Sequence, residues 1–267
     1  MGKGKPFLEV LSSALHEDYR FPLLEIFAFL YAIGTFVLAN FGVGLISSST
    51  VSGATTYNVI SSLLTMPLFI FLILIFKNIA YGLGSDLEKG IIQTYFSYPL
   101  KRRGILTAKL LSALGVALLL FLGIQISALY ILAPDIVLPH LGTVLLTYVA
   151  NLSYPFFIAG IMLLLTLILR RGGITLVIGI VLYFAMAIVT GIATVFALVS
   201  QNPLLFQIVS GISPSTILAQ YFSAFPVLGE FWVPTFSEVL LYIGASYVLV
   251  ASLFTLGYLY FSRRLNL

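Results

Sequence analysis

Long stretches without a charged side chain constrain this sequence more than any other feature. Asp, Glu, Lys and Arg are all missing from residues 26–76, 110–134, 141–169, 172–229 and 239–262. About 20 apolar residues cross the hydrocarbon core of a bilayer as one helix. The runs are apolar on every side and do not alternate, which favours helices over the strands of a membrane barrel. The sequence therefore predicts an all-α membrane protein.

Composition excludes the other broad classes. The 267 residues are 60% hydrophobic and 8% charged, whereas a soluble domain is about 45–50% apolar and about 25% charged. Soluble, disordered, collagen-like and coiled-coil chains are excluded on that ground. Cysteine is absent, so disulfides and thiolate chemistry are excluded as well.

Six transmembrane helices fit the apolar runs. The polar stretch Ser47 to Gly53 divides the first long run into two spans. The predicted spans are Phe21–Ile46, Tyr57–Gly82, Ile105–Ala133, Leu141–Leu169, Ile174–Ser200 and Phe236–Phe261. Together they define a transmembrane domain over residues 21–267, preceded by a separate segment over residues 1–20.

Residues 201–236 are too broken by proline to cross the bilayer. They contain Pro203, Pro214, Pro226 and Pro234, and the apolar pieces between them are about ten residues or shorter. Such pieces suit re-entrant half-helices or an outer cap. A long ordered outer loop fits the pattern equally well.

The basic residues predict the orientation. On the six-span map all 13 Lys and Arg lie on one side of the membrane. Because basic residues flank the cytoplasmic ends of spans, both termini are expected in the cytoplasm of a multi-pass cell-membrane protein. The net charge of +4 then follows from topology and is no indication of nucleic-acid binding.

The N-terminal segment has the pattern of an amphipathic helix. An apolar stripe is formed by Phe7, Leu8, Leu11 and Leu15, and polar side chains cover the remaining surface. A helix of this kind lies in the headgroup layer of the cytoplasmic leaflet, in contact with membrane lipids. The alternative is a short cytosolic helix packed on protein.

The connection between the second and third spans predicts a second amphipathic helix. Ser85 and Glu88 form a capping-box pattern that starts a helix, and Tyr98 ends it because a residue before proline avoids the helical region. Its apolar face is Leu87, Ile91 and Tyr95. Such a helix over residues 85–98 is either a docking handle for a cytoplasmic partner or a connector lying on the membrane.

The residues around this connection resemble a known family. The pattern is Glu88-x-Gly90, then Pro99-Leu100-x-Arg102, then Ile105-Leu106-x-x-Lys109. It resembles the type-2 ABC exporter permeases, six-span subunits that associate with a separate ATPase. The resemblance implies that residues 85–98 are the coupling helix, residues 1–20 the elbow helix and residues 201–236 an outer re-entrant hairpin. One departure is the basic triplet at residues 101–103, where members often carry a single Arg.

The resemblance also implies which residues serve the ATPase. The residues that it assigns to coupling are Asp86, Glu88, Gly90, Ile91, Tyr95, Pro99, Arg102 and Lys109. A second permease copy or homologue is the other expected partner, with spans one and five at the dimer interface. The chain has no Gly-x-x-x-x-Gly-Lys-Ser/Thr phosphate loop, so ATP and its magnesium are expected in the partner ATPase, and the chain itself binds no cofactor.

The expected cargo is hydrophobic or amphipathic: a drug, a peptide or a lipid. Its path is expected to be apolar and aromatic, with Asn40, Tyr183, Phe184 and Phe196 as the candidate lining residues. Uncharged polar residues such as Gln125 more often bond neighbouring helices than touch cargo.

Three other functions are compatible with parts of this pattern. A non-translocating subunit for substrate capture or regulation has the same composition, and so does a permease for a lipid-linked glycan. An intramembrane enzyme fits poorly, because no His, Lys or carboxylate lies deep in a span to activate a nucleophile. His16 and His140 are far apart and form no metal-ligand cluster.

Overall fold

The chain is built from helices. The computed structural model describes residues 5–44, 52–97, 99–132, 134–222 and 232–263, and these contain no β-strand, which confirms the all-α class. In chain order the elements are α1 (Lys5–Asp18), α2 (Leu23–Gly44), α3 (Gly53–Ile75), the π-helix η1 (Phe76–Leu83), α4 (Gly84–Glu88), α5 (Ile91–Tyr95), α6 (Arg102–Leu110), the π-helix η2 (Leu111–Gly115), α7 (Val116–Leu132), α8 (Pro134–Val137), the 3-10 helix η3 (Leu138–His140), α9 (Leu141–Leu169), α10 (Gly172–Val199), α11 (Pro203–Ile212), α12 (Ser215–Tyr221) and α13 (Phe236–Arg263).

The long helices are those of a multi-pass membrane protein. Among the described residues, five helices are long and apolar enough to cross a bilayer. The number is six if the pair Pro6–Asp18 and Leu23–Val37, which meet at 65°, forms one bent span.

Most predicted span boundaries hold within a few residues. The fourth span coincides with α9, and α10 and α13 match the fifth and sixth spans closely. The second span differs, because its helix runs without interruption past the predicted end at Gly82 to Glu88. The predicted ends at Ile46 and Ala133 lie outside the described residues.

The predicted single helix over residues 85–98 is wrong. Leu83 and Gly84 are already helical. Ser85 therefore lies inside the second span, which continues past it, and does not begin a new helix. The capping-box prediction fails for the same reason, and α4 ends at Glu88. Gly90 then adopts the left-handed conformation with φ of 70°, and the short helix α5 follows. Tyr98 lies outside the described residues.

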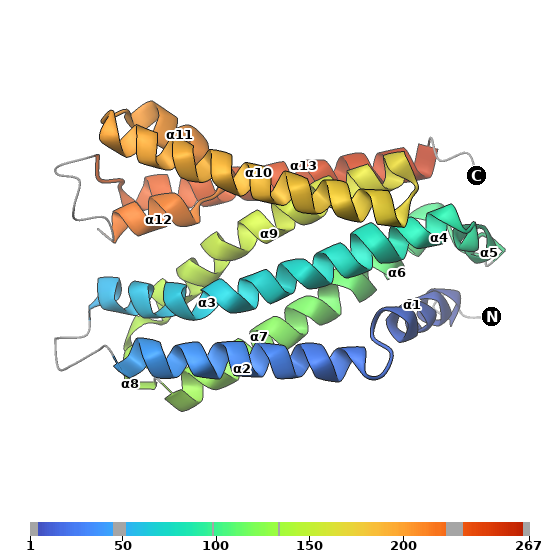
Figure 1. Cartoon of the computed structure of the whole chain (residues 1–267), viewed down its shortest axis with the longest axis horizontal. Helices are drawn as coiled ribbons and strands as arrows, with labels where there is room; N and C mark the ends of the chain where they lie inside the picture. The colour runs from blue at the N-terminus through green and yellow to red at the C-terminus, as the bar shows by residue number, and fades with distance from the viewer. Residues whose placement is uncertain (1–4, 45–51, 98, 133, 223–231, 264–267) are drawn as a thin grey trace.

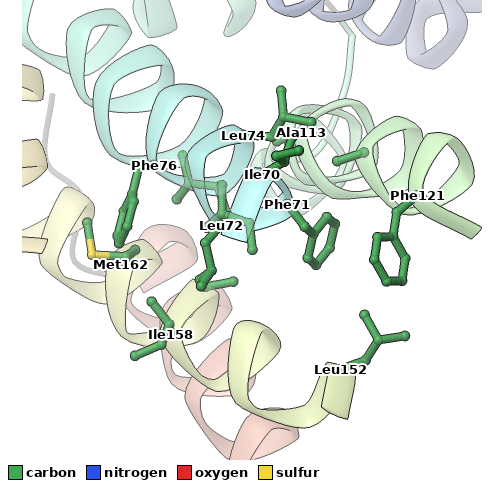
Figure 2. Packing of buried hydrophobic residues seen from close by; sticks show 14 of the residues in the cluster. Ile70, Phe71, Leu72, Leu74, Phe76, Ala113, Phe121, Leu152, Ile158 and Met162 are labelled. Atoms are coloured by element: carbon green, nitrogen blue, oxygen red, sulfur yellow. The ribbon is translucent and has the colours of Figure 1, made fainter. Parts of the chain in front are cut away.

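Helix α3 occupies the centre of the bundle. Figure 2 shows Phe71 of α3 between side chains of α7 and α9, among them Phe121 and Ile158. The Phe71 ring lies 5.7 Å from that of Phe121 and 5.9 Å from that of Phe156, measured between centroids. In the second span, 61% of an apolar 18-residue stretch is buried within the chain, whereas in α10 the corresponding share is only 6%. The apolar surface of α10 is therefore left for lipid or another chain.

One end of the bundle collects the basic residues. Figure 1 shows that α1, α4 and α5 lie together at the end where α13 finishes, while α8 and α12 lie at the other. The turn at Arg170 and Arg171 belongs to the former, because Gly172 packs against Gly84. The end of α13 belongs there too, since the Tyr258 hydroxyl donates to Thr107 Oγ1 at 3.1 Å. We call this the basic end.

Two short helices close the opposite end. Residues 203–221 form α11 and α12, of the lengths expected for half-helices. Asn202 caps α11 by accepting from the backbone N–H groups of Leu204 and Leu205. Buried Phe206 and Ile217 anchor the pair in a cluster with residues of α9, α10 and α13. Residues 223–231, in the rest of this predicted segment, lie outside the described residues.

Candidate functional site

A group of charged side chains joins three elements at the basic end. Lys109 of α6 lies at its centre, with its Nζ 2.7 Å from Glu17 Oε2 of α1 and 2.6 Å from Asp86 Oδ2 of α4. The Lys109 and Asp86 side chains are only 7% and 2% exposed. Both carboxylates are thus within ion-pair distance of the same ammonium. The Lys109 ammonium therefore connects the N-terminal helix to the end of the second span and to the start of the third.

The two π-helices add a second set of bonds to this group. Lys77 Nζ of η1 donates to the backbone oxygen of Asp18 and to Asn78 Oδ1. The Asn78 amide donates to the Tyr19 hydroxyl at 2.9 Å. Both Asn78 and Tyr19 donate to the carbonyl oxygen of Ala113 in η2. π-turns change the helical hydrogen-bond pattern and occur often at functional sites. The two π-helices therefore make this region a candidate functional site.

Asp18 completes the set. Its Oδ2 accepts a hydrogen bond from the Ser112 hydroxyl at 2.5 Å. We call Glu17, Asp18, Lys77, Asn78, Asp86, Lys109 and Ser112 the charged corner.

The two carboxylates that α1 supplies have opposite pKa shifts. Partial burial acts to raise the pKa of Glu17, but the hydrogen bond and positive charge of Lys109 outweigh it and hold that pKa below its usual range. Burial dominates at Asp18 and raises its pKa, against the hydrogen bond from Ser112 and the charges of Lys109 and Lys77.

An apolar layer lies beside the charged corner and fixes α1. Val10 of α1 packs with Tyr95, Ile105 and Ala108, and Ala14 of α1 is fully buried. The Tyr95 hydroxyl is 3.3 Å from Ser13 Oγ. The helix predicted from the N-terminal pattern is therefore present, and this face of it rests on protein.

The predicted stripe of α1 is not a single buried face. Phe7 and Leu11 pack against the apolar layer, whereas Leu8 is 61% exposed. The innermost positions are instead Val10 and Ala14. Leu8 thus lies on a separate apolar edge of the helix.

Helix α10 meets α4 through a close backbone approach. A Cβ atom on Gly84 would lie 2.7 Å from Gly172 Cα, and one on Gly172 would lie 2.8 Å from the Tyr81 carbonyl oxygen. Glu88 adds a cap, because its Oε2 accepts from the Gly172 N–H at 3.1 Å. A carboxylate at a helix N-terminus is stabilising. The start of α10 is thus coupled to the end of the second span.

The residues assigned to coupling divide into two groups. Asp86, Tyr95 and Lys109 are buried within the chain, and Ile91 is half-buried against the apolar layer. The surface group is Glu88, Gly90, Pro99 and Arg102, of which Gly90 is half-exposed. The Arg102 guanidinium lies 5.0 Å from the centroid of the Phe96 ring.

The predicted path residues also divide. Tyr183 and Phe184 of α10 line a groove against the second span, together with Phe69, Ile73 and Phe76. We call this the apolar groove. Phe196 is 61% exposed and is not among its lining residues, so the structure does not bring it to the other two. Asn40 lies in α2, and its side chain is outside the described part.

Gln125 serves the packing of the bundle, as predicted. Its amide donates to Thr35 Oγ1 at 2.7 Å, and its Oε1 accepts from the Tyr148 hydroxyl at 2.9 Å. These bonds connect α2, α7 and α9 in the bundle core.

Several residues of the charged corner were not singled out from the sequence. Glu17 belongs to the polar surface that the sequence predicts for the N-terminal helix, and no sequence pattern indicates a role for Asp18, Asn78 or Ser112. Their signal in the sequence is weak, because pairing with Lys77 and Lys109 becomes visible only when α1 folds back onto the second and third spans. No group of His, Asp or Glu in the described residues could hold a metal ion.

No protein-family model matches the chain, and no curated protein matches it in sequence. The function is therefore inferred from the charged corner and the apolar groove.

Proposed function

We propose that this chain is the membrane-spanning permease subunit of an ATP-driven ABC exporter. It lies in the cell membrane with both termini in the cytoplasm, so that the basic end faces the cytoplasm. ATP is hydrolysed by a separate nucleotide-binding subunit. The chain supplies the path for a hydrophobic or amphipathic cargo.

The observation that carries the proposal is the way α5 is mounted. Gln93 and Thr94 are exposed on α5, at the connection between two long apolar helices. The opposite face of α5 is anchored by buried Ile92 and Tyr95. A partner that docks on the exposed face therefore pushes on a helix that cannot move independently of the bundle.

The charged corner supports transmission of force from α5. Its ion pairs join α4 to α1 and α6 through Lys109, while Glu88 and Gly84 join α4 to α10. Movement of α4 and α5 is thus passed to the N-terminal helix α1 and to the third and fifth spans together. Asp86, Tyr95 and Lys109 serve as positioning residues, since their burial keeps them from direct contact with a partner.

The exposed apolar faces support assembly with a second permease. Helix α10 carries large exposed side chains along most of its length, and α2 exposes Ile26, Phe29 and Ile33. A second copy or a homologous permease covering α2 and α10 agrees with the interface implied by the family resemblance. The apolar groove, which holds Tyr183 and Phe184, is the candidate wall of the path.

Inside-out membrane vesicles that carry the chain and its ATPase test the proposal. We expect ATP-dependent accumulation of a fluorescent amphiphilic dye and its loss in Gly90→Pro. Proline cannot adopt the φ of 70° at this position. Gly90→Asn is the matched control and should retain transport, because Asn tolerates the left-handed region.

The same vesicles separate the competing functions. A subunit for capture or regulation assembles with its complex without ATP-dependent dye flux. A lipid-linked glycan permease moves its glycan lipid but not the dye. Full transport in a Gly90→Pro chain of unchanged stability contradicts the coupling role of this connection.

A further inference from the structure

The apolar groove continues into a polar pocket at the basic end. Lys77 and Tyr81 line both the groove and the pocket, so the two form one depression with two chemically different halves. The apolar half has a volume of about 460 Å³ and the polar half about 660 Å³. Each half lies within the range of ligand pockets, about 300–1,000 Å³.

The polar half presents three cationic side chains. Arg20, Lys77 and Lys89 line it, and Arg20 and Lys89 are exposed. Lys77 donates to two neutral oxygens, those of the Asp18 backbone and the Asn78 amide. The ammonium also faces the Tyr19 ring, 5.6 Å from its centroid, so none of these three partners is an anion.

The acidic neighbours of this pocket are already engaged. Glu17 pairs with Lys109 at 2.7 Å, and the Asp18 carboxylate accepts from Ser112. Both residues line the polar half themselves, but each carboxylate already has a partner other than the three cations of the pocket. The polar half therefore favours an anion.

The apolar half favours a hydrocarbon chain. Apart from Lys77 at its end, the groove is lined by apolar and aromatic side chains, including Phe69, Ile73, Ile180 and Phe184. Those four side chains are 38–52% exposed, so the groove opens at the surface of the bundle. A soluble anion gains nothing from such a lining.

We propose that this depression binds one anionic phospholipid of the inner leaflet. Its phosphate lies among Arg20, Lys77 and Lys89, and one acyl chain lies along the apolar groove. Basic pockets between helices on the cytoplasmic side are suited to anionic headgroups. Its place in the inner leaflet rests on the proposed orientation, and the lipid occupies the groove that we assign to cargo.

Native mass spectrometry of the purified full-length chain in detergent tests the site. Phosphatidylglycerol and phosphatidylcholine with identical acyl chains are supplied in equal amounts. We expect one phosphatidylglycerol to remain bound per chain, with at least about tenfold preference over phosphatidylcholine. Equal retention of the two lipids overturns the proposal, because the cations of the pocket then do not distinguish an anionic headgroup from one without net charge.

Charge variants locate the headgroup. Arg20→Gln combined with Lys89→Gln should weaken phosphatidylglycerol binding by about thirtyfold, at about fivefold for each basic residue. The matched control is Lys101→Gln combined with Arg103→Gln, which removes the same charge from exposed positions outside the pocket. If the double variant in the pocket fails to fold, Lys89→Gln alone should give about a fivefold loss.

Groove variants locate the acyl chain. Ile180→Trp fills the groove and should weaken binding of both lipids. Ile178→Trp is the matched control, because Ile178 is equally exposed at 38% and does not line the groove. An Ile180→Trp chain that binds both lipids as before contradicts the site.

Glycerol phosphate separates a lipid from a free anion. Added at the concentration of the lipid, it should leave phosphatidylglycerol bound. Displacement at that concentration overturns the proposal, because the acyl chain then contributes nothing to binding.

Discussion

Lys109 is the residue on which the charged corner converges. Its ammonium contacts carboxylates of α1 and α4 and lies 5.1 Å from the centroid of the Tyr95 ring. Burying such charges costs solvation free energy that mutual attraction offsets only when every partner is present. The arrangement is thus better suited to fixing the relative position of three elements than to adding net stability.

Removing Lys109 should therefore cost more than removing an exposed lysine. Lys109→Met leaves Asp86 buried without its counter-charge and should lower the free energy of unfolding by about 3–5 kcal/mol. Lys109→Met combined with Asp86→Leu should recover most of that loss. Thermal unfolding in detergent measures both, with Lys101→Met as the exposed control, expected within about 0.5 kcal/mol of the natural chain. A Lys109→Met chain of natural stability contradicts this account of the charged corner.

Glu17 and Asp18 predict opposite dependences on pH. The pKa of Glu17 is lowered, so its charge stabilises the fold above its unfolded pKa of about 4.3, and that stability is lost as the pH falls through the folded pKa. Glu17→Gln should cost about 0.2–1 kcal/mol at pH 7 and nothing in acid.

For Asp18 the sign reverses. Its pKa is raised, so the protonated form suits the fold, and that stability is lost as the pH rises through the folded pKa. Asp18→Asn should therefore compare more favourably with the natural chain at high pH than at low pH, because it removes a charge whose burial is costly. Thermal melts of both variants between pH 3.5 and 7.5 check the pair. An Asp18→Asn chain that compares less favourably with the natural chain at high pH than at low pH runs against the assignment.

At the scale of elements, the junction of α4 with α10 depends on two glycines. Both Gly84 and Gly172 lie where a Cβ atom would meet backbone atoms at 2.9 Å or less, which a flexible side chain cannot relieve. Gly173, one residue further along, has open space around its Cβ position. The junction therefore offers a test with a neighbouring control.

Gly172→Ala should push α10 away from α4 and lower stability by about 1–3 kcal/mol, the usual cost of overpacking. Gly173→Ala should be neutral or slightly stabilising, because alanine is the better helix former. Thermal unfolding and dye transport are measured for both. Similar losses in the two variants imply that helix propensity, and not the close approach, sets the effect.

Elements were predictable from the sequence where a single run of residues decides them. The apolar stretch between His140 and Arg170 fixes α9, since its length and its polar flanks together permit one helix. Continuation of the second span to Glu88 was not predictable, because the local capping pattern at Ser85 competes with a helix that arrives from the preceding turn. Burial of Lys109 depends on α1 folding back across 92 residues of sequence separation, which no local pattern reports.

At the scale of the whole molecule, α1, α4, α5 and the end of α13 lie together at one end (Figure 1). Labelling from one side of the membrane can therefore show on which side this basic end lies. The absence of cysteine in the natural chain allows single-cysteine variants to answer it without background labelling. Gln93→Cys at the basic end should resist a membrane-impermeant maleimide added to intact cells. Ser200→Cys at the opposite end should react. Labelling of Gln93→Cys from outside reverses the proposed orientation.

The proposed function requires a separate ATPase to dock on α5, and cross-linking from α5 detects that contact. A photo-cross-linking amino acid replaces Gln93, with Ser200 as the control at the opposite end, and the products formed in native membranes are sequenced. We expect an ATPase with a phosphate-binding loop to be cross-linked at position 93 and not at position 200. The contradicting result is its absence at position 93, or its capture at position 200, in a chain that is folded and inserted.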